Sequence, residues 1–123
     1  MSSKTIWYHG SPVKMELLRE GSTITRWKEL AEAFSHKPPV LCIDDQNEIL
    51  HNGEQPGYLY HIDEELLIGE DIYQHPRTTM EEGLEFLTRR LLRLKLLYPV
   101  PAPDSDVLAD SQRKIEALIQ KYK

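Results

Sequence analysis

The pattern of apolar and polar positions in the first third of the chain predicts short strands followed by one helix. β-Branched and aromatic residues run from Thr5 to His9 and stop at Gly10-Ser11-Pro12, so we expect a strand that presents His9 at its end. Residues 22–25 form a second strand candidate, after a turn at Glu20-Gly21. Helical spacing follows on Trp27, Leu30, Ala31 and Phe34.

The middle of the chain carries further strand and turn signals. Thr25 is a suitable N-cap for the expected helix, and Pro38-Pro39 closes that helix. Val40 to Asp44 is expected to form a buried strand, and Gly57 to Ile62 is expected to form another. Between these strands, Asn52-Gly53 is typical of a tight turn.

Residues 81–97 fit two kinds of secondary structure. Over residues 92–96, three leucines alternate with Arg93 and Lys95, as in a strand. One face of a helix is formed equally well by Leu84, Leu87, Leu91 and Leu94. Periodicity alone does not decide between the two.

The end of the chain predicts a proline-rich connector followed by a helix. The connector spans residues 99–103, and Asp104 or Ser105 can cap a helix within residues 104–123. Such a helix docks on its own domain or, less commonly, mediates a homodimer. Its apolar face comprises Val107, Leu108, Ser111, Ile115, Leu118, Ile119 and Tyr122.

Composition narrows the class of protein. A chain of 123 residues with 40% hydrophobic content is large enough for one core. The net charge of −5 disfavours a nucleic-acid partner, because a broad basic surface is missing. Cys42 is the only cysteine, so no disulfide can form within the chain. No apolar run reaches the length of a membrane span, so we expect no membrane contact and a cytoplasmic location.

Two positions far apart in the sequence are candidates for chemistry. His9 stands beside a glycine, which allows a ligand to approach the backbone, and Glu85 opens an apolar stretch late in the chain. A metal site is not expected, because the remaining histidines lack ligand spacing with cysteine or with a second carboxylate. These histidines are His36, His51, His61 and His75.

The segment Trp7-Tyr8-His9-Gly10-Ser11-Pro12 resembles the opening of the ADP-ribosyltransferase-like fold. That family includes poly(ADP-ribose) polymerases, small rifamycin-modifying transferases and RNA 2'-phosphotransferases. The resemblance implies an α+β fold with a split β-sheet core and flanking helices over residues 1–98, to which the C-terminal helix is an addition. In the family the histidine holds a ribose hydroxyl of NAD and the glycine contacts the nicotinamide amide. These roles carry over to His9 and Gly10, with Ser11 beside them.

The later motifs of the family fall on Thr23 and Glu85. Thr23 takes the place of a strand residue that is often tyrosine, so Tyr58 or Tyr60 is expected to supply the ring that packs on nicotinamide. Glu85 looks like the family's catalytic glutamate, which implies that the residues after it form a strand. Gly83 stands where arginine-modifying members carry glutamate or glutamine, which disfavours arginine as the acceptor. By resemblance, the polar loop of residues 74–79 borders the acceptor site.

The resemblance implies an NAD-dependent enzyme that cleaves the nicotinamide-ribose bond and transfers ADP-ribose to an unidentified acceptor. His9 and Glu85 are its expected catalytic residues. Two alternatives stay open. One is a catalytically inactive domain of the same fold that binds NAD, ADP-ribose or a protein. The other is an interaction module that assembles through the C-terminal helix.

Overall fold

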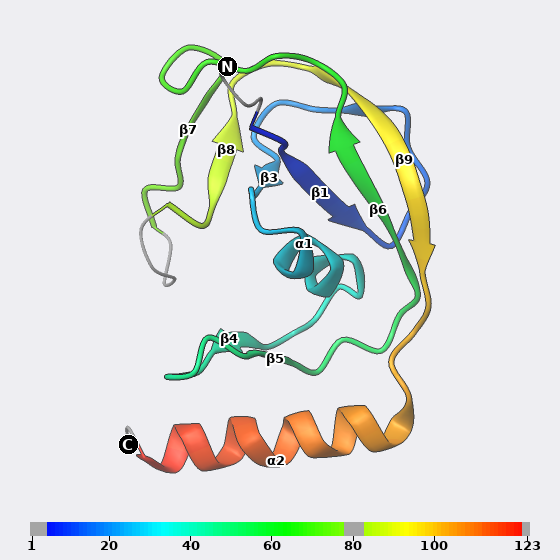
Figure 1. Ribbon diagram of the computed structural model, residues 1–123, viewed down its shortest axis with the longest axis vertical. Helices are drawn as coiled ribbons and strands as arrows, with labels where there is room; N and C mark the ends of the chain where they lie inside the picture. The colour runs from blue at the N-terminus through cyan, green and yellow to red at the C-terminus, as the bar shows by residue number, and fades with distance from the viewer. Residues whose placement is uncertain (1–4, 78–82, 122–123) are drawn as a thin grey trace.

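The computed structural model describes residues 5–77 and 83–121 and shows a mixed α+β chain (Figure 1). Its strands pair in antiparallel fashion in every described ladder, and its two described helices lie on one side of the larger sheet. In chain order the elements are β1 (Tyr8–Ser11), β2 (Leu17–Leu18), β3 (Thr23–Ile24), α1 (Lys28–Ser35), β4 (Leu41–Ile43), β5 (Ile49–His51), β6 (Gly57–Ile62), β7 (Ile72–Gln74), β8 (Phe86–Thr88), β9 (Leu92–Val100) and α2 (Ser105–Lys121).

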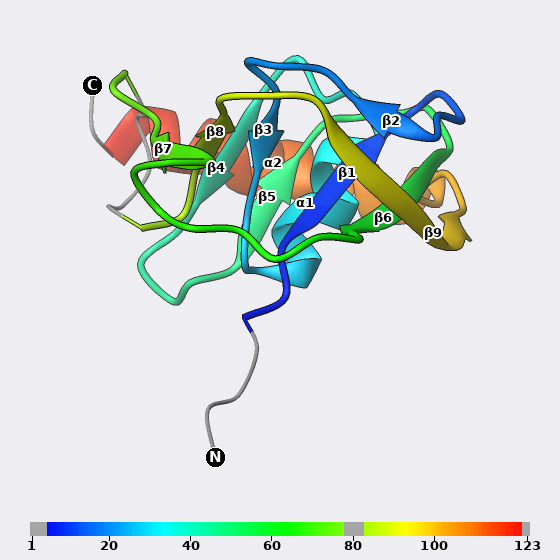
Figure 2. The same cartoon turned by 90° about the horizontal axis from the view of Figure 1, so that it is seen from above.

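The strands form three groups. A four-stranded sheet has the order β1-β6-β9-β2, a three-stranded sheet has the order β3-β8-β7, and β4 pairs with β5 in a hairpin. The long strand β9 is strongly curved and gives the larger sheet its curl, as both ribbon views show (Figure 2). The two larger sheets meet at a bridge between Tyr8 and Thr25, and β1 and β3 separate after it. His9 is therefore the first residue of β1 beyond the point where the sheets join.

Helix α1 lies directly against the backbone of β1 and β6, because both strands have glycine at the contact. A Cβ atom on Gly10 would stand 1.8 Å from the carbonyl oxygen of Ala31. A Cβ atom on Gly57 would stand 2.3 Å from the carbonyl oxygen of Ser35. Heavy atoms cannot approach this closely, so any side chain at either position would push the helix off the sheet.

The main core lies between the two larger sheets. Trp7 and Phe86 form an edge-to-face pair there, with ring centroids 4.9 Å apart, which joins the start of β1 to β8. The buried members of this cluster are Trp7, Leu18, Ile24, Ile62, Ile72, Phe86 and Leu92. The core therefore holds the strands that carry the N-terminal and the late sequence motifs in one rigid unit.

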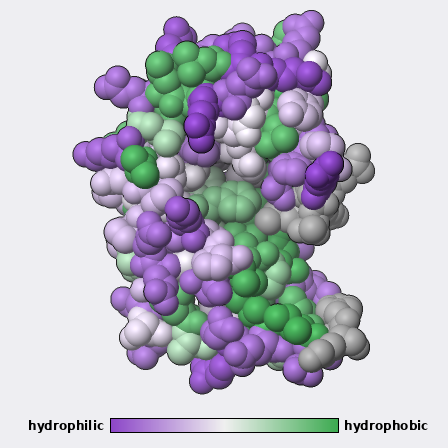
Figure 3. Space-filling model, turned by 180° about the vertical axis from the view of Figure 1, so that it is seen from behind, coloured by the Kyte–Doolittle hydropathy of each residue, from purple (hydrophilic) through white to green (hydrophobic). Residues whose placement is uncertain are grey.

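The β4–β5 hairpin and α2 form a separate layer beneath α1 (Figure 1). Ile115 is the one described α2 residue classed as buried. Lys114 pairs with Glu48 at 2.9 Å and Lys121 pairs with Asp45 at 2.8 Å, both at exposed positions that contribute little stability. Hydrophobic side chains gather over this hairpin on the back of the molecule (Figure 3). Neither described helix is long and apolar enough to cross a membrane.

Several predicted elements are confirmed. Gly57 to Ile62 is a strand with the expected bounds, and the strands of residues 40–44 and 22–25 form with shorter bounds. The strand within residues 40–44 is only half-buried, however, so the prediction that it is buried is wrong. The predicted helix after Thr25 forms as α1 and the C-terminal helix forms as α2. The ambiguous residues 81–97 contain β8 and the start of β9, with no helix over the described residues 83–97.

Other local predictions are wrong. Strand β1 continues through Gly10 and Ser11, because both pair with β6, so His9 lies inside the strand and not at its end. Thr25 does not cap α1: it pairs with Tyr8, and the N-cap position is Trp27. Asn52-Gly53 is not a hairpin turn, because β4 and β5 are joined by residues 44–48, where Asn47 adopts φ 62°.

The C-terminal predictions also need correction. Strand β9 runs through Pro99 to Val100, which pairs with Gly57, so the break in structure lies between Pro101 and Asp104. On α2, Val107 and Ile119 are each 55% exposed and lie about 120° apart around the helix axis. They do not form one apolar stripe, and single exposed apolar residues are common on monomers. Tyr122 lies outside the described residues.

Candidate functional site

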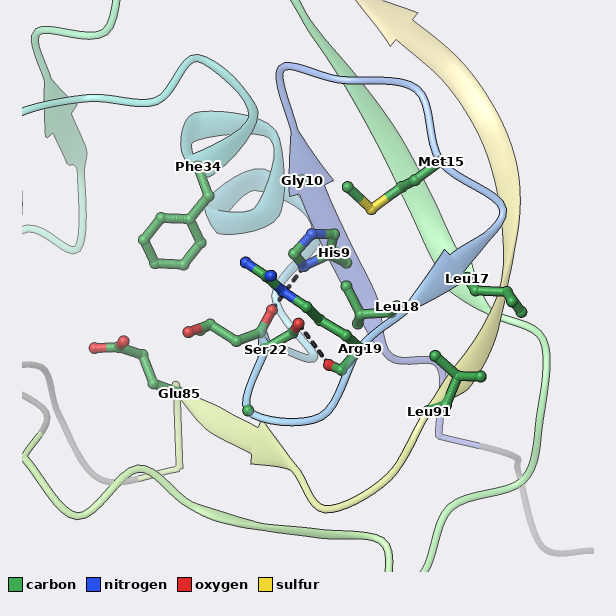
Figure 4. Close-up of a pocket in the computed structure, with 12 residues that line it drawn as sticks. His9, Gly10, Met15, Leu17, Leu18, Arg19, Ser22, Phe34, Glu85 and Leu91 are labelled. Atoms are coloured by element: carbon green, nitrogen blue, oxygen red, sulfur yellow. Dashed lines mark hydrogen bonds between the residues drawn. The ribbon is translucent and has the colours of Figure 1, made fainter.

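A pocket of about 570 Å³ opens where β1 and β3 separate. This volume lies within the range of small-molecule and cofactor sites. Its residues come from β1, the β1–β3 connection, the start of β3, α1, the entrance to β8 and the turn before β9 (Figure 4). The pocket is lined by His9, Gly10, Met15, Leu17, Leu18, Arg19, Gly21, Ser22, Thr23, Phe34, Glu85 and Leu91.

His9 is held in one orientation by the backbone of β3. Its Nδ1 lies 2.8 Å from the carbonyl oxygen of Thr23, and a carbonyl can only accept, so Nδ1 carries the proton. Burial lowers the pKa of His9 from 6.5, and the bond to Thr23 opposes this shift only in part. Near neutral pH the ring is therefore uncharged. In that form Nε2 is unprotonated and can accept a hydrogen bond from a ligand hydroxyl.

We expect the imidazole of His9 to titrate in the folded protein with a midpoint below pH 6.5, because its pKa is lowered by burial. The folded state then binds fewer protons than the unfolded state, so stability falls as pH drops below about 6.5 and through the folded pKa. An NMR pH titration of the histidine ring protons measures the midpoint, with the urea-unfolded chain as the reference. A folded midpoint equal to or above the unfolded one would contradict this description of the site.

Glu85 and Phe34 lie together on one side of His9 in the close-up (Figure 4). Glu85 immediately precedes β8, and its carbonyl oxygen accepts a hydrogen bond of 3.0 Å from the amide of His75. Phe34 extends from the last turn of α1, the helix that lies on Gly10. This side of the pocket therefore combines a carboxylate, an aromatic ring and a neutral imidazole.

The other side of the pocket is apolar, whereas the guanidinium of Arg19 extends past His9 toward Phe34 (Figure 4). Met15, Leu17 and Leu91 lie together there, away from Glu85 (Figure 4). Leu17 is 51% exposed and Leu91 is 55% exposed, so both can cover a bound molecule. Arg19 also lines the pocket and can pair with a phosphate oxygen. The whole pocket therefore suits an elongated ligand with aromatic or apolar ends, hydroxyls and negative charge.

The structure brings four of the predicted site residues together and leaves three elsewhere. His9, Gly10, Thr23 and Glu85 all line the pocket, although Thr23 lies in a different sheet from His9 and Glu85 immediately precedes a strand of that other sheet. The residues that do not line it are Ser11, Tyr58 and Tyr60. His9 and Glu85 thus line the same pocket although they lie far apart in the sequence.

The two tyrosines are occupied by other contacts. Tyr60 is 1% exposed, and its hydroxyl accepts a hydrogen bond from the amide of Met15 and donates one to the carbonyl of Val13. Tyr58 lies in a separate hollow among prolines, with the ammonium of Lys14 5.6 Å from its ring centroid. The expectation that either ring packs on a ligand in the His9 pocket is therefore wrong.

Ser11 and Gly10 also have structural explanations. Ser11 is buried, and its Oγ accepts a hydrogen bond of 3.1 Å from the amide of Val13, which stabilises the turn after β1. Gly10 is required by the contact with α1, which differs from the sequence-based reason of close ligand approach. Its backbone still lines the pocket.

Sequence analysis missed several residues of the pocket, and Phe34 and Arg19 are the ones that bear most on its chemistry. Phe34 was assigned only to the apolar face of α1, and the helical spacing gave no indication that its ring faces a cavity. Arg19 belongs to none of the sequence motifs, so no signal pointed to it. Of the polar loop at residues 74–79, Thr78 and Thr79 lie outside the described residues. Within the described part of the chain, no group of three His, Cys, Asp or Glu side chains is arranged to hold a metal ion.

Comparison with known proteins gives no relative to transfer a function from. No family model matches the chain, and neither the curated proteins nor the solved structures contain a match.

Proposed function

We propose that this chain binds NAD in the His9 pocket and cleaves the bond between nicotinamide and ribose, transferring ADP-ribose to an acceptor. The observation that carries the proposal is the convergence of His9, Thr23 and Glu85 on one pocket of about 570 Å³. The resemblance assigned the contact with the ribose hydroxyl to His9, the second family motif to Thr23 and the catalytic charge to Glu85. The proposal covers the chemistry and leaves the acceptor open.

The nicotinamide end of NAD is placed beside Phe34, Gly10 and Glu85. Phe34 is the aromatic residue among the pocket's lining side chains, so its ring takes the stacking role that was expected of a tyrosine. The neutral imidazole of His9 accepts a hydrogen bond from a hydroxyl of the adjoining ribose. Arg19 then faces the diphosphate, and Met15, Leu17 and Leu91 cover the adenine end.

The chemistry requires a stabilised cation at the ribose. Loss of nicotinamide leaves positive charge on the anomeric carbon and ring oxygen, as in glycoside hydrolysis. A carboxylate on the pocket wall stabilises that charge most when it is fully developed, which accelerates the step. Glu85 is the carboxylate among the lining residues. His9 is uncharged near neutral pH, so it does not oppose the developing cation.

The test compares binding and turnover of NAD by the wild type and by Phe34→Leu. We expect the wild type to release free nicotinamide, measured by chromatography. Phe34→Leu should weaken NAD binding about tenfold in calorimetry, because it loses the stacking contact. ADP-ribose lacks nicotinamide, so its affinity should be unchanged. Tyr58→Leu is the matched control and should alter neither affinity, because Tyr58 lies outside the pocket.

Three outcomes distinguish the alternatives. Binding of NAD without nicotinamide release identifies a catalytically inactive module of the same pocket. An equal loss of NAD and ADP-ribose affinity in Phe34→Leu would place the nicotinamide elsewhere. If the wild type binds neither ligand, the proposal is wrong and an interaction role is left.

A further inference from the structure

We propose that Arg26 is a positioning residue for Glu85, and this inference rests on the function proposed above. Arg26 lies between β3 and α1, and it does not line the pocket. Its guanidinium carbon is 5.3 Å from the ring centroid of Trp7 and 5.5 Å from that of Phe86. Its Nη2 also donates a hydrogen bond of 3.3 Å to the carbonyl oxygen of Gly83. Phe86 and Gly83 flank Glu85 closely in the sequence.

The contacts of Arg26 fix the approach of the chain to Glu85. Gly83 adopts φ +90°, a conformation that favours glycine, and its amide donates a hydrogen bond of 3.1 Å to the side-chain oxygen of Gln74. The amide of His75 bonds to the carbonyl oxygen of Glu85 at 3.0 Å. The segment from Gly83 to Glu85 is therefore held by β7 on one side and by Arg26 on the other.

Arg26 also links the two halves of the pocket. It is three residues after Thr23, and it comes just before α1, the helix that carries Phe34. Through Gly83 and Phe86 it reaches the strand that follows Glu85. A guanidinium is suited to this position, because it can stack on aromatic faces and donate in its own plane. A lysine ammonium keeps the charge but not this combined geometry.

We expect Arg26→Met to lower kcat for nicotinamide release about tenfold or more while KM stays close to the wild-type value, because the carboxylate is displaced and the binding residues are not. The kcat of Arg26→Lys should fall almost as far, because lysine keeps the positive charge but not the planar geometry of the guanidinium. Arg89→Met is the matched control. Arg89 lies 4.4 Å over the ring of Tyr73 and does not line the pocket, so this variant should keep the wild-type kcat.

A double variant tests whether Arg26 acts through Glu85. In a Glu85→Gln background, Arg26→Met should cause no further loss of kcat, because the group that it positions is gone. An undiminished loss in that background would overturn the inference. A normal kcat in Arg26→Met, or a raised KM with unchanged kcat, would overturn it equally.

A second measurement separates this inference from the proposed function. Amide hydrogen exchange at Gly83 and His75 should be about tenfold faster in Arg26→Met than in Arg89→Met, because Arg26 holds that segment in place. This measurement needs no enzyme activity. Absence of nicotinamide release by the wild type would refute the proposed function alone, whereas unchanged exchange at both amides would refute the role of Arg26.

Discussion

Replacing Glu85 with glutamine is expected to slow nicotinamide release from NAD on the order of 10²-fold or more. Glutamine keeps the size and hydrogen-bonding reach of the side chain but removes the negative charge, which stabilises the oxocarbenium-like transition state. Because that charge matters most in the transition state, kcat should fall while the affinity for NAD changes little. Single-turnover rates with labelled NAD, together with calorimetric affinities, measure the two effects separately.

Glu70→Gln provides the matched control for this experiment. Glu70 is exposed, lies in the turn before β7 and does not line the pocket, so its turnover should equal that of the wild type. Equal loss of activity in both variants would point to net charge and not to a specific carboxylate. A Glu85→Gln enzyme with wild-type kcat would remove Glu85 from the chemistry.

A methyl group at Gly10 is expected to destabilise the fold by at least about 3 kcal/mol, the upper end of usual overpacking costs. The added Cβ would lie 1.8 Å from the carbonyl oxygen of Ala31 and 2.8 Å from the amide nitrogen of Ser35, both of which are backbone atoms. No rotamer change can relieve such a contact, so α1 must move away from β1. Urea unfolding of Gly10→Ala followed by circular dichroism measures the loss.

The control is Gly21→Ala, which makes the same chemical change at an open position. No atom lies within 4 Å of its added Cβ, but φ is +84°, so only backbone strain of about 1 kcal/mol is expected. Gly57→Ala should resemble Gly10→Ala, because its Cβ would meet the backbone of Ser35. Similar losses at Gly10 and Gly21 would show that α1 yields easily and would contradict the tight contact.

Sequence reasoning could predict the strands and helices wherever local signals agreed. Gly57 to Ile62 has β-branched and aromatic residues bounded by turn residues, and its observed bounds match the predicted ones. Residues 92–96 could not be assigned in this way, because helical and alternating patterns coexist there. Tertiary pairing decides the matter, since β9 pairs with both β6 and β2.

The misplaced tyrosines have a specific cause. Simple alternation along β6 would put Tyr58 and Tyr60 on the same face. The pairing of β6 with β9 shifts register between Leu59 and Tyr60, which breaks the alternation. As a result Leu59 and Tyr60 are both buried, whereas Tyr58 is only partly buried. A bulge of this kind depends on the partner strand, and no feature of residues 57–62 indicates it.

The convergence of His9 and Glu85 was predicted through a motif and not through geometry. Nothing in the local sequence requires β3 and β8 to pair, yet this pairing brings Thr23 beside Leu87 and thereby carries Glu85 to the pocket. Phe34 could have been found only by knowing that α1 crosses Gly10. Contacts between distant segments therefore determine the part of the site that was missed.

Helix α2 lies away from the His9 pocket, so this end of the molecule is suited to the attachment of labels and linkers. No described residue of α2 lines the His9 pocket, and the helix rests on the β4–β5 hairpin. A fluorophore attached at the exposed Val107, or a surface linker at Ile119, would therefore sit on a layer remote from the ligand. Immobilised or labelled protein prepared in this way should report ligand affinities that match those of the unmodified chain.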